Sequence, residues 1–574
     1  MNAPNPGTPS AEGTVADAYL RLLAERGIDC LFANAGTDFA PLIEGYARAG
    51  EGVSTPRPVL VPHENVAVAM AMGYWLLSRR MQAVMVHVSV GTANAICGLI
   101  NACRAHVPIL MTAGRTPLNE TGLEGHRNLL IHWTQEMYDQ SAMLREFVKW
   151  DYELRNAEQM EIVVDRAIAM AQAAPAGPVY LTLPREVIAT RLESPPETLP
   201  AGRRAPPAPP GPDPRAIEQA AGMLASAKNP VLITTSAGMD LAALAPLAEL
   251  CERYAVPLVH HSARCMSLPT SHPMHAGFDP VPWMREADLI LVVDSVVPWI
   301  PGTIRPKADA KVIHVGADPL HGGIPTRGFE CDLGITSIAS LALKALLEAL
   351  DRRGGPGAHV EARRASIVKR REERLAKVRA DLEPMRAQSP IRTQWLTHCV
   401  SEACDERTTI IREAPAFSYP HFRADHEHAY YATGAASGLG WGLGAAIGAK
   451  MAAPERTIIL ATGDGSYMFG VPVAAHYTAM EQDAPFLTVI MNNRRWNEVG
   501  VATRLMYPDG LAVREKREAL THFDRRLELA KVVECVGGHG EQVTDPAKLP
   551  EAIARALRIV REERRQAVLD VVCA

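Results

Sequence analysis

Two things are missing from this 574-residue sequence that would indicate metal-binding or nucleic-acid-binding proteins. Its ten cysteines contain no CxxC pair, which argues against a zinc site or a disulfide framework and predicts reduced thiols. It has no basic excess, because 59 Lys and Arg stand against 64 Asp and Glu, for a net charge of -5. Such a balance does not attract nucleic acid or an anionic membrane surface, so we expect no nucleic-acid partner.

Long hydrophobic runs are missing as well. The longest apolar stretch, around residues 66–77, is too short to cross a bilayer. Residues 1–10 are polar and Pro-rich, with neither the cationic region nor the apolar core of a signal peptide. We therefore expect a soluble cytoplasmic protein with no membrane partner.

The length and the pattern of apolar residues predict the architecture. A chain of this length is too long for one core, and about three domains are expected. Short Val, Ile and Leu runs alternate with helical segments in three blocks, at residues 11–193, 214–350 and 390–574. A Pro-rich linker at 194–213 separates the first two, and a charged segment at 351–388, interpreted as a connecting helix pair, separates the last two. The alternation predicts three doubly wound α/β domains with parallel sheets.

One pair of motifs in the third block indicates a ligand site. Residues 457–466 read TIILATGDGS, an apolar strand that runs into a glycine-flanked aspartate, Asp464. A second strand, 486–491, runs directly into Asn492 and Asn493. Ligands of open parallel sheets bind at the carboxyl ends of the strands, so Asp464 and Asn493 are expected side by side at that edge.

These residue types suit a hard cation bound with phosphates. Mg²⁺ prefers oxygen ligands in octahedral array, and Ca²⁺ accepts the same donors. Asp464, the amide oxygen of Asn493 and the backbone carbonyl of Arg495 would supply half of the shell, and two diphosphate oxygens and a water would complete it. The glycines allow the backbone to come close to phosphate groups. The expected cofactor-binding residues of this loop are Gly463, Asp464, Gly465 and Ser466.

Each motif alone is better explained as a turn. Together, each after a β-rich run and at this separation, they match the signature of thiamine-diphosphate (ThDP) enzymes. A glycine run at 438–444 has some likeness to a dinucleotide-binding fingerprint, but it lacks the supporting strand and acid. It is better explained by close packing of a helix beside the ThDP site.

A candidate for the activation of ThDP lies in the first block. The chemistry needs a carboxyl group that hydrogen-bonds N1′ of the aminopyrimidine ring in a water-poor site. Glu64 stands between an apolar strand and the apolar helix at 66–77, where burying an acid without a purpose is costly. The alternative is an acid favoured by the helix dipole. Beside the Asp464–Asn493 site, we favour the catalytic interpretation.

The sequence resembles the pyruvate oxidase/acetolactate synthase branch of ThDP enzymes and is most similar to benzoylformate decarboxylase. The likeness runs over nearly the whole chain, in the order pyrimidine-binding, central and diphosphate-binding domain. Besides the motifs above, the matching segments are 32–37 (FANAGT), 87–92 (HVSVGT), 149–152 (KWDY), 177–184 (GPVYLTLP), 264–265 (RC) and 269–273 (PTSHP).

The resemblance implies roles for further residues. His87 and His272 match the two active-site histidines and would protonate the enamine left after CO₂ departs and assist aldehyde release. Without the resemblance, His87 would be a core residue and His272 a surface residue. Thr37 matches the serine that binds the substrate carboxylate. Leu439 would enforce the bent shape of the cofactor, and the carbonyl of Ser437 would accept a hydrogen bond from its 4′-amino group.

Some positions depart from the benzoylformate decarboxylase pattern. Thr433 replaces an aromatic wall, and Glu498, Val499 and Ala502 replace small and apolar substrate contacts. The loop at 493–497 reads NRRWN in place of a small, polar sequence. A pocket that is larger or more polar than one for a phenyl ring is expected.

The predicted function is therefore non-oxidative decarboxylation of a 2-oxo acid to an aldehyde and CO₂, dependent on ThDP and Mg²⁺. The alternatives are a carboligase or lyase of the acetolactate synthase or benzaldehyde lyase kind, and a ThDP-binding subunit without turnover. The resemblance implies a homodimer or homotetramer, because the glutamate and the metal site of one cofactor come from different subunits. It argues against FAD. His421, His426 and His428 imitate a metal cluster, but a solvated loop explains them better.

Overall fold

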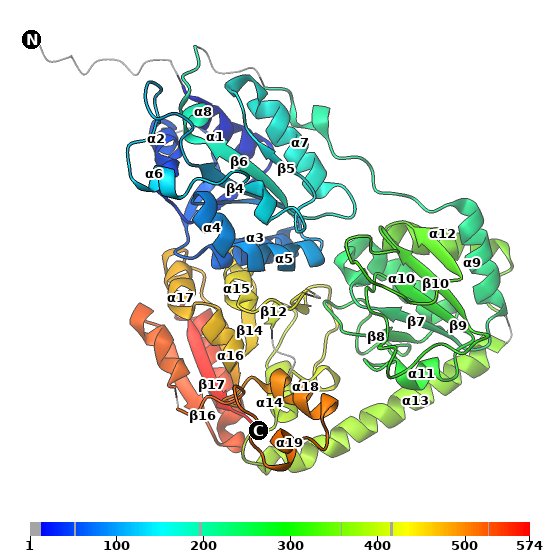
Figure 1. The fold of residues 1–574 in the computed structure, drawn as a ribbon. Coiled ribbons are helices and arrows are strands. Elements are labelled where there is room, and N and C mark those ends of the chain that lie inside the picture. Colours follow the sequence, from blue (N-terminus) through cyan, green and yellow to red (C-terminus); the bar gives the residue numbers. More distant parts are fainter. Residues whose placement is uncertain are drawn as a thin grey trace, which may run out of the picture. The chain divides into compact units, whose positions relative to one another are not determined.

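A computed structural model describes residues 13–50, 53–193, 198–357, 359–413, 417–434, 436–525 and 527–574. The polar segment 1–10, the first residues of the first predicted block and residues 194–197 of the predicted linker lie outside the described residues. The chain divides into two compact units, Met1–Pro207 and Ala208–Ala574, which are described in turn (Figure 1).

The first unit contains a six-stranded parallel sheet in the order β2-β1-β3-β4-β6-β5. Its strands are β1 (Cys30–Ala33), β2 (Arg57–Leu60), β3 (Gln82–Val86), β4 (Ile109–Arg115), β5 (Asp151–Glu153) and β6 (Val179–Pro184). All residues of β1, β3 and β6 are buried, as expected for a parallel sheet covered on both faces.

Helices cover both faces of this sheet. They are α1 (Val15–Glu25), α2 (Ala40–Arg48), α3 (Glu64–Ser78), α4 (Val88–Asn94), α5 (Ile96–Arg104), α6 (Ile131–Thr134), α7 (Met160–Gln172) and α8 (Arg185–Ala189). On one face, α1 and α7 share a core with alternate strand residues such as Leu31. On the other, Tyr74 of α3 meets Phe32 edge-on, with ring centroids 6.3 Å apart.

The second unit begins with a five-stranded parallel sheet in the order β11-β10-β9-β7-β8. Its strands are β7 (Pro230–Thr234), β8 (Leu258–His260), β9 (Leu289–Val293), β10 (Lys311–Gly316) and β11 (Leu333–Thr336), and its helices are α9 (Pro214–Ser226), α10 (Leu244–Arg253), α11 (Val281–Met284) and α12 (Ala339–Arg352). Alternate residues of β7 and β9 point into two separate cores, one on each face.

A six-stranded parallel sheet follows in the order β13-β12-β14-β15-β17-β16. Its strands are β12 (Thr408–Arg412), β13 (Tyr430–Ala432), β14 (Thr457–Gly463), β15 (Leu487–Asn492), β16 (His539–Val543) and β17 (Ala567–Val572). Its helices are α14 (Thr393–Glu402), α15 (Trp441–Ala452), α16 (Asp464–Phe469), α17 (Pro472–Glu481), α18 (Asn497–Met506), α19 (Leu511–Arg514) and α20 (Leu549–Arg561). The expected fold class, three parallel α/β domains, is therefore confirmed.

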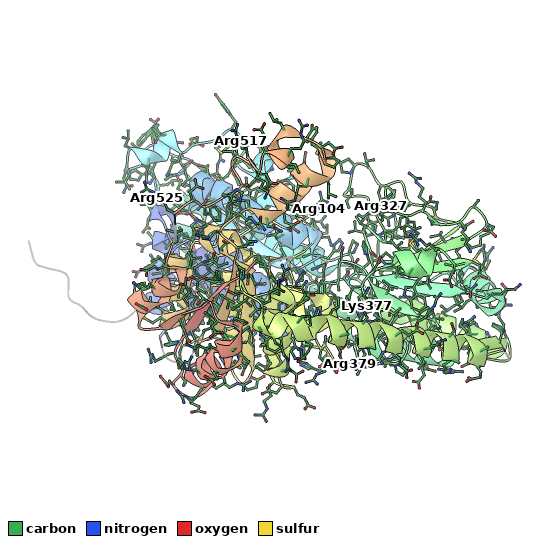
Figure 2. All side chains as sticks on the ribbon, turned by 90° about the horizontal axis from the view of Figure 1, so that it is seen from below. Arg104, Arg327, Lys377, Arg379, Arg517 and Arg525 are labelled. Atoms are coloured by element: carbon green, nitrogen blue, oxygen red, sulfur yellow. The ribbon has the colours of Figure 1, made fainter. Side chains whose placement is uncertain are left out.

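One long helix, α13 (His359–Leu382), connects the two sheets of the second unit (Figure 1). The predicted helix pair is wrong, because the charged segment forms this single helix and then a short 3₁₀ turn, Glu383–Ala387. Arg363 fastens α13 to the central sheet through four backbone carbonyls. Lys377 and Arg379, also on α13, are labelled in Figure 2. The charges mostly form an exposed face, as expected.

The apolar run at 83–90 predicts one strand over its whole length, but the strand that forms there is shorter. β3 ends at Val86, and Val88 takes a left-handed backbone conformation (φ +31°) that turns the chain into α4. The Thr92 hydroxyl donates to the Val88 carbonyl, one helical turn back, at 2.6 Å. His87 is therefore the residue that precedes α4 and not a strand residue.

Two expected absences can be compared with the described part of the chain. None of its helices is long and apolar enough to cross a membrane. All ten cysteines lie in described segments, and no two of them form a disulfide. In the linker, residues 198–213 form only one 3₁₀ turn, Ala201–Arg204, before α9 begins.

Candidate active site

Three of the predicted site residues meet at one edge of the N-terminal sheet. Thr37, Glu64 and His87 follow β1, β2 and β3, which are neighbours in the sheet and end at the same edge. Thr37 is exposed, and the other two are half-buried. The electrostatic influence of Glu64 reaches the His87 ring. The parallel pairing of β1, β2 and β3 thus brings together residues that are up to 50 positions apart in the sequence.

Glu64 is the first residue of α3, as its sequence context predicts. Its Oε2 accepts a hydrogen bond from Asn94 Nδ2 at 2.5 Å, and its Oε1 would lie 3.3 Å from a side chain placed on Gly91. His63 Nδ1 accepts from the Asn65 amide, so the imidazole and not Glu64 caps the helix. The Glu64 carboxylate is left near the surface of the unit, able to meet a ligand.

His87 has a partner that the sequence did not reveal. Its Nδ1 lies 2.5 Å from Oδ1 of Asp38, a carboxylate with only 3% of its surface exposed. The hydrogen bond to Asp38 raises the pKa of His87 and outweighs the opposing effect of burial. The one sequence signal for Asp38 was its place directly after Gly36 and Thr37, at the carboxyl end of a strand.

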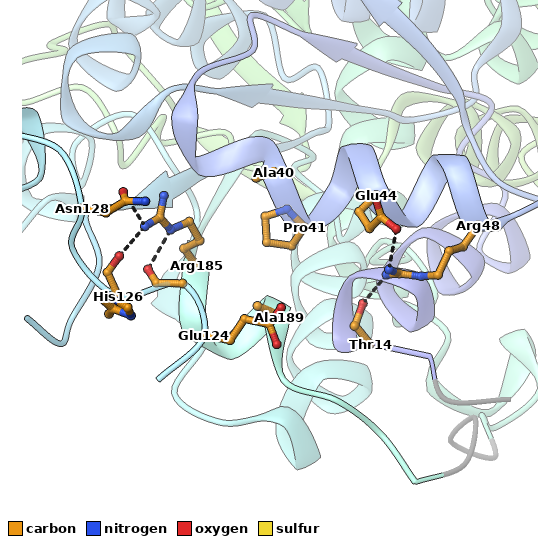
Figure 3. Close-up of a pocket in the computed structure, with 11 residues that line it drawn as sticks. Thr14, Ala40, Pro41, Glu44, Arg48, Glu124, His126, Asn128, Arg185 and Ala189 are labelled. Atoms are coloured by element: carbon orange, nitrogen blue, oxygen red, sulfur yellow. Dashed lines mark hydrogen bonds and ion pairs between the residues drawn. The ribbon is translucent and has the colours of Figure 1, made fainter. Parts of the chain in front are cut away.

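A cavity of about 310 Å³ lies on the other side of the segment that carries Thr37. Figure 3 shows it between α2 and α8. Its two arginines are engaged: Arg48 bonds to Thr14 and pairs with Glu44, and Arg185 donates to the carbonyls of Gly125 and His126. Arg185 also donates to the Thr37 carbonyl at 3.4 Å. We interpret this arginine as a clamp on the turn that carries Thr37 and Asp38.

The predicted metal residues converge at the carboxyl edge of the C-terminal sheet. Asp464 follows β14 and the loop of Asn493 follows β15, the neighbouring strand. Asp464 Oδ2 accepts from the Arg494 amide at 2.6 Å, and Oδ1 accepts from the Gly465 amide at 2.8 Å. Burial raises the pKa of Asp464 despite these bonds. No cationic side chain pairs with it among the ion pairs of the described residues.

The structure separates the roles of the two asparagines. Asn492 is buried, and its Nδ2 donates to Oδ1 of the buried Asp570 at 2.7 Å. Asn493 is half-buried, and its Oδ1 contacts only the nearby Arg495 amide, at 3.2 Å. Asn492 thus stabilises the sheet, and Asn493 is available as a ligand.

These donors fit a hard cation. A buried carboxylate without a cationic partner and an available amide oxygen are the ligands that Mg²⁺ prefers, with phosphate oxygens completing the shell. Among the described residues, no group of three or more His, Cys, Asp or Glu could hold a metal. The proposed site contains one carboxylate and an amide, so it is not a group of that kind, and the finding does not argue against it.

The glycine run leads into α15, and a buried glutamate accepts hydrogen bonds from the amides at the start of this helix. Glu413, just after β12, accepts from the amides of Gly440, Trp441 and Gly442 at 2.6–3.0 Å. A side chain on Gly442 would overlap this carboxylate and Leu460, so the expected close packing of the helix is present. Burial raises the pKa of Glu413 to about 7. Sequence analysis missed Glu413, which stands far from the glycine run in the chain.

Ser437 and Leu439 lie immediately before that helix. Ser437 is exposed and has a left-handed backbone (φ +50°), which fixes the direction of its carbonyl, and Leu439 is half-buried. Both are accessible for a ligand, as their predicted roles require. In the loop after β14, the Trp496 ring lies where a side chain on Gly465 would be, so a glycine is needed here for the close approach of this ring.

His272 does not lie at the carboxyl edge of the C-terminal sheet, where Asp464 lies. Its loop joins the amino end of β8, where Met274 O accepts from Leu258 N, and Ser271 N donates to Asp425 at 2.9 Å. The next residue, His426, faces Arg456 and Glu406, which precede β14 and β12. Asp464 lies at the opposite end of β14. Burial also lowers the pKa of His272, which disfavours a proton donor.

The positions that depart from the benzoylformate decarboxylase pattern are accessible. Glu498, Val499 and Ala502 lie on exposed parts of α18, shortly after the loop of Asn493, and Thr433 is half-buried after β13. The three histidines of the 421–428 segment have separate surroundings. His421 Nδ1 contacts Ser418 Oγ at 2.8 Å, and His428 Nδ1 contacts Tyr431 OH at 2.7 Å.

Comparison with known proteins defines the class. Residues 13–143 match the family model "Thiamine pyrophosphate enzyme, N-terminal TPP binding domain", residues 217–346 the central domain, and residues 414–571 the C-terminal TPP binding domain. The chain belongs to the thiamine pyrophosphate enzyme family, and thiamine diphosphate is its cofactor.

Within this family, relatives of different activity are similarly close. The chain is 28% identical to sulfoacetaldehyde acetyltransferase of Rhodobacter capsulatus, over 95% of this chain and 92% of the relative. It is also 28% identical to benzoylformate decarboxylase of Pseudomonas aeruginosa, over 84% and 86%. The crystal structure of benzoylformate decarboxylase from Polynucleobacter necessarius has the same fold, with a TM-score of 0.78 at 21% identity over 98% of this chain and 99% of that one. The resemblance to this branch is thereby confirmed.

Proposed function

We propose that this protein is a non-oxidative 2-oxo-acid decarboxylase that forms an aldehyde and CO₂ with ThDP and Mg²⁺. The observation that carries the proposal is the grouping of Thr37, Glu64 and His87 at one sheet edge, with the pKa of His87 raised by Asp38. A histidine that holds its proton near neutral pH suits the protonation step that follows loss of CO₂.

The residues divide the work as follows. When bound, ThDP supplies the electron sink for decarboxylation. The Glu64 carboxyl group hydrogen-bonds the cofactor at N1′. The Thr37 hydroxyl donates to the substrate carboxylate. Nε2 of His87 donates a proton to the reacting carbon after CO₂ has left, and no role is assigned to His272.

The diphosphate end is held by the other half of the proposed site. Asp464, Asn493 and the Arg495 carbonyl would bind Mg²⁺, or Ca²⁺ in its place, and the backbone at Gly463, Gly465 and Ser466 would approach the phosphates. The Ser437 carbonyl and Leu439 would orient the two rings of the cofactor.

A second candidate is carboligation or acyl transfer. It is supported by the exposed Ala502, which leaves room for an acceptor, and by the similarity to an acetyltransferase. FAD has no part in either proposal.

Several broader features belong to the same proposal. The boundaries 11–193, 214–350 and 390–574 would be the pyrimidine-binding, central and diphosphate-binding domains. The enzyme would work as a homodimer or homotetramer on a small-molecule substrate. The absence of disulfides among the ten cysteines favours the reducing cytoplasm.

The test is a panel of aromatic, aliphatic and charged 2-oxo acids with added ThDP and Mg²⁺, with and without an acceptor aldehyde. Release of CO₂ and free aldehyde without ligated product supports decarboxylation, and ligated product supports the second candidate. In Glu64→Gln we expect kcat to fall about 100-fold or more with an unchanged melting temperature. The exposed Glu44→Gln is the matched control. Full activity of Glu64→Gln with every substrate found would contradict the catalytic role of Glu64.

A further inference from the structure

Asp38 is a buried carboxylate that forms an ion pair with a histidine. Among the ion pairs of the described residues, Asp38 pairs with His87 alone, at 2.5 Å between Oδ1 and Nδ1. Its Oδ2 accepts only a long bond from the Val88 amide, at 3.4 Å. An isolated buried carboxylate is costly unless a nearby cation or donors compensate it. The pair is therefore most stable when His87 carries the proton.

Two glycines make room for this pair. A side chain on Gly36 would overlap the His87 ring, and a side chain on Gly114 would overlap the Asp38 carboxylate. Gly36 precedes Thr37 after β1, and Gly114 lies near the end of β4. The contact thus depends on the backbone of two strands, one on each side of β3, in addition to the two side chains.

The surroundings of the pair are mixed in charge. Around His87 lie Asp38 from the turn after β1, Glu64 from α3, and the Gln135 amide, all of which favour the protonated ring. His132 on α6 faces His87 and Asp38, and burial lowers its pKa. Arg185 from α8 and Tyr180 from β6 face Asp38. Asp38 has the largest influence on His87, and it is the closest.

We propose that Asp38 is a positioning residue for His87, holding Nδ1 and keeping the imidazole protonated so that Nε2 can deliver the proton. This inference rests on the proposed function for its catalytic consequence, but the pairing itself can be tested without turnover. It has the logic of a carboxylate that orients a catalytic imidazole and stabilises its charged form.

The sign of the pH effect follows from the geometry. Because Asp38 raises the pKa of His87, the ring stays protonated to higher pH than an ordinary histidine and loses its proton as the pH rises through that pKa. Removing the charge of Asp38 should move this loss to lower pH. An opposite charge at this distance shifts such a titration by about one pH unit or more.

The direct experiment is an NMR titration of the full-length protein labelled with [¹³Cε1]histidine in a deuterated background. The missing resonance in His87→Gln assigns His87. We expect its midpoint in Asp38→Asn to lie about one pH unit or more below that of the wild type. Asp17→Asn is the matched control, because Asp17 is also buried in this unit but bonds to Arg48 and Thr14, and it should leave the midpoint unchanged.

A second variant approaches the pair from the other side. Gly114→Ala leaves both charged residues in place but forces the Asp38 carboxylate away from His87, so it should lower the midpoint as well. If Asp38→Asn does not fold, Gly114→Ala still tests the pairing. A midpoint of His87 that is the same in the wild type and in either folded variant overturns the pairing.

Kinetics then separate positioning from a structural role. With a 2-oxo acid that is turned over, Asp38→Asn should lower kcat about tenfold or more and leave KM nearly unchanged. The basic limb of its pH profile should move to lower pH, in parallel with the NMR midpoint. An unmoved limb contradicts a catalytic consequence of the pair. If the wild type turns over no 2-oxo acid, the proposed function fails, while the titration still decides whether Asp38 controls His87.

Discussion

At the scale of single residues, two adjacent asparagines, Asn492 and Asn493, have different roles at this site. Asn492 is the last residue of β15 and Asn493 is the residue after it, and the two have the same side chain. The pleat of the strand decides which of the two is buried, because successive side chains of an extended segment point to opposite sides. Asn492 turns into the sheet toward Asp570, and Asn493 is left half-exposed at the edge.

This division gives a paired prediction. Asn493→Ala should raise the Mg²⁺ concentration needed for half-activation of the apoenzyme about tenfold or more, with little change in thermal stability. Asn492→Ala should instead destabilise the fold by about 1–3 kcal/mol, because Asp570 is fully buried and loses a donor. Metal titration of activity and thermal unfolding measure the two effects. The assignment of Asn493 as the ligand is wrong if the two variants exchange these phenotypes.

At the scale of elements, the start of α15 depends on Glu413. Three successive amides at a helix beginning have no partner inside the helix, and here one carboxylate accepts from all of them. The helix beginning stands directly after Leu439, and Glu413 also lies 3.5 Å from the hydroxyl of Thr462, two residues before Asp464. One side chain thus connects both loops of the proposed diphosphate site.

Titration of this carboxyl group has a predictable effect on the helix. With a pKa of about 7, above the ordinary 4.5, Glu413 takes up a proton as the pH falls through 7 and loses part of its capacity to accept. Protection of the amides of Gly440, Trp441 and Gly442 against hydrogen exchange, corrected for intrinsic rates, should be lower at pH 6 than at pH 8.

At pH 8, that protection should be up to roughly tenfold lower in Glu413→Gln than in the wild type, because the amide group offers fewer acceptors than the carboxylate. At pH 6, where Glu413 is mostly protonated, the difference should be smaller. ThDP binding, followed by tryptophan fluorescence, should weaken in parallel. Glu402→Gln, an exposed change at the end of α14, serves as the control. Equal protection in wild type and Glu413→Gln would falsify the role of Glu413 as the anchor.

At the scale of the whole molecule, the proposed site divides between Glu64 in the first unit and Asp464 in the second. In the branch that this chain resembles, these two residues come from different subunits for each cofactor. Neither Glu64→Gln nor Asp464→Asn should then be active alone. In a symmetric dimer, a mixed oligomer would contain one site with both native residues.

Co-expression of the two inactive variants should therefore restore roughly a quarter of the wild-type activity, since half of the random dimers are mixed and each has one intact site of two. The measurement is turnover of a 2-oxo acid by the purified mixture, with each variant alone as the control. No recovery in mixtures that are shown to contain mixed oligomers contradicts a site shared between subunits.

The sequence itself determined the three α/β blocks, the cofactor class and the positions of Asp464 and Asn493 at two strand ends, because each is encoded locally. Buried parallel strands are continuous apolar runs, and Asp464 and Asn493 stand directly after two of them. The short strand β13 and the polar strand β16 have no such pattern, and neither was expected. The length of β3 was misjudged because Val88 continues an apolar run while its backbone turns.

Only the tertiary structure decided the contacts between distant parts of the chain. Asp38 and His87 are 49 positions apart, and Glu413 and Gly440 are 27 positions apart. His272 matched a motif, but its loop packs at the amino end of its sheet. The local sequence determines which residues stand directly after a strand. The order of the strands in the sheet, and the packing of loops against them, determine which of those residues come into contact.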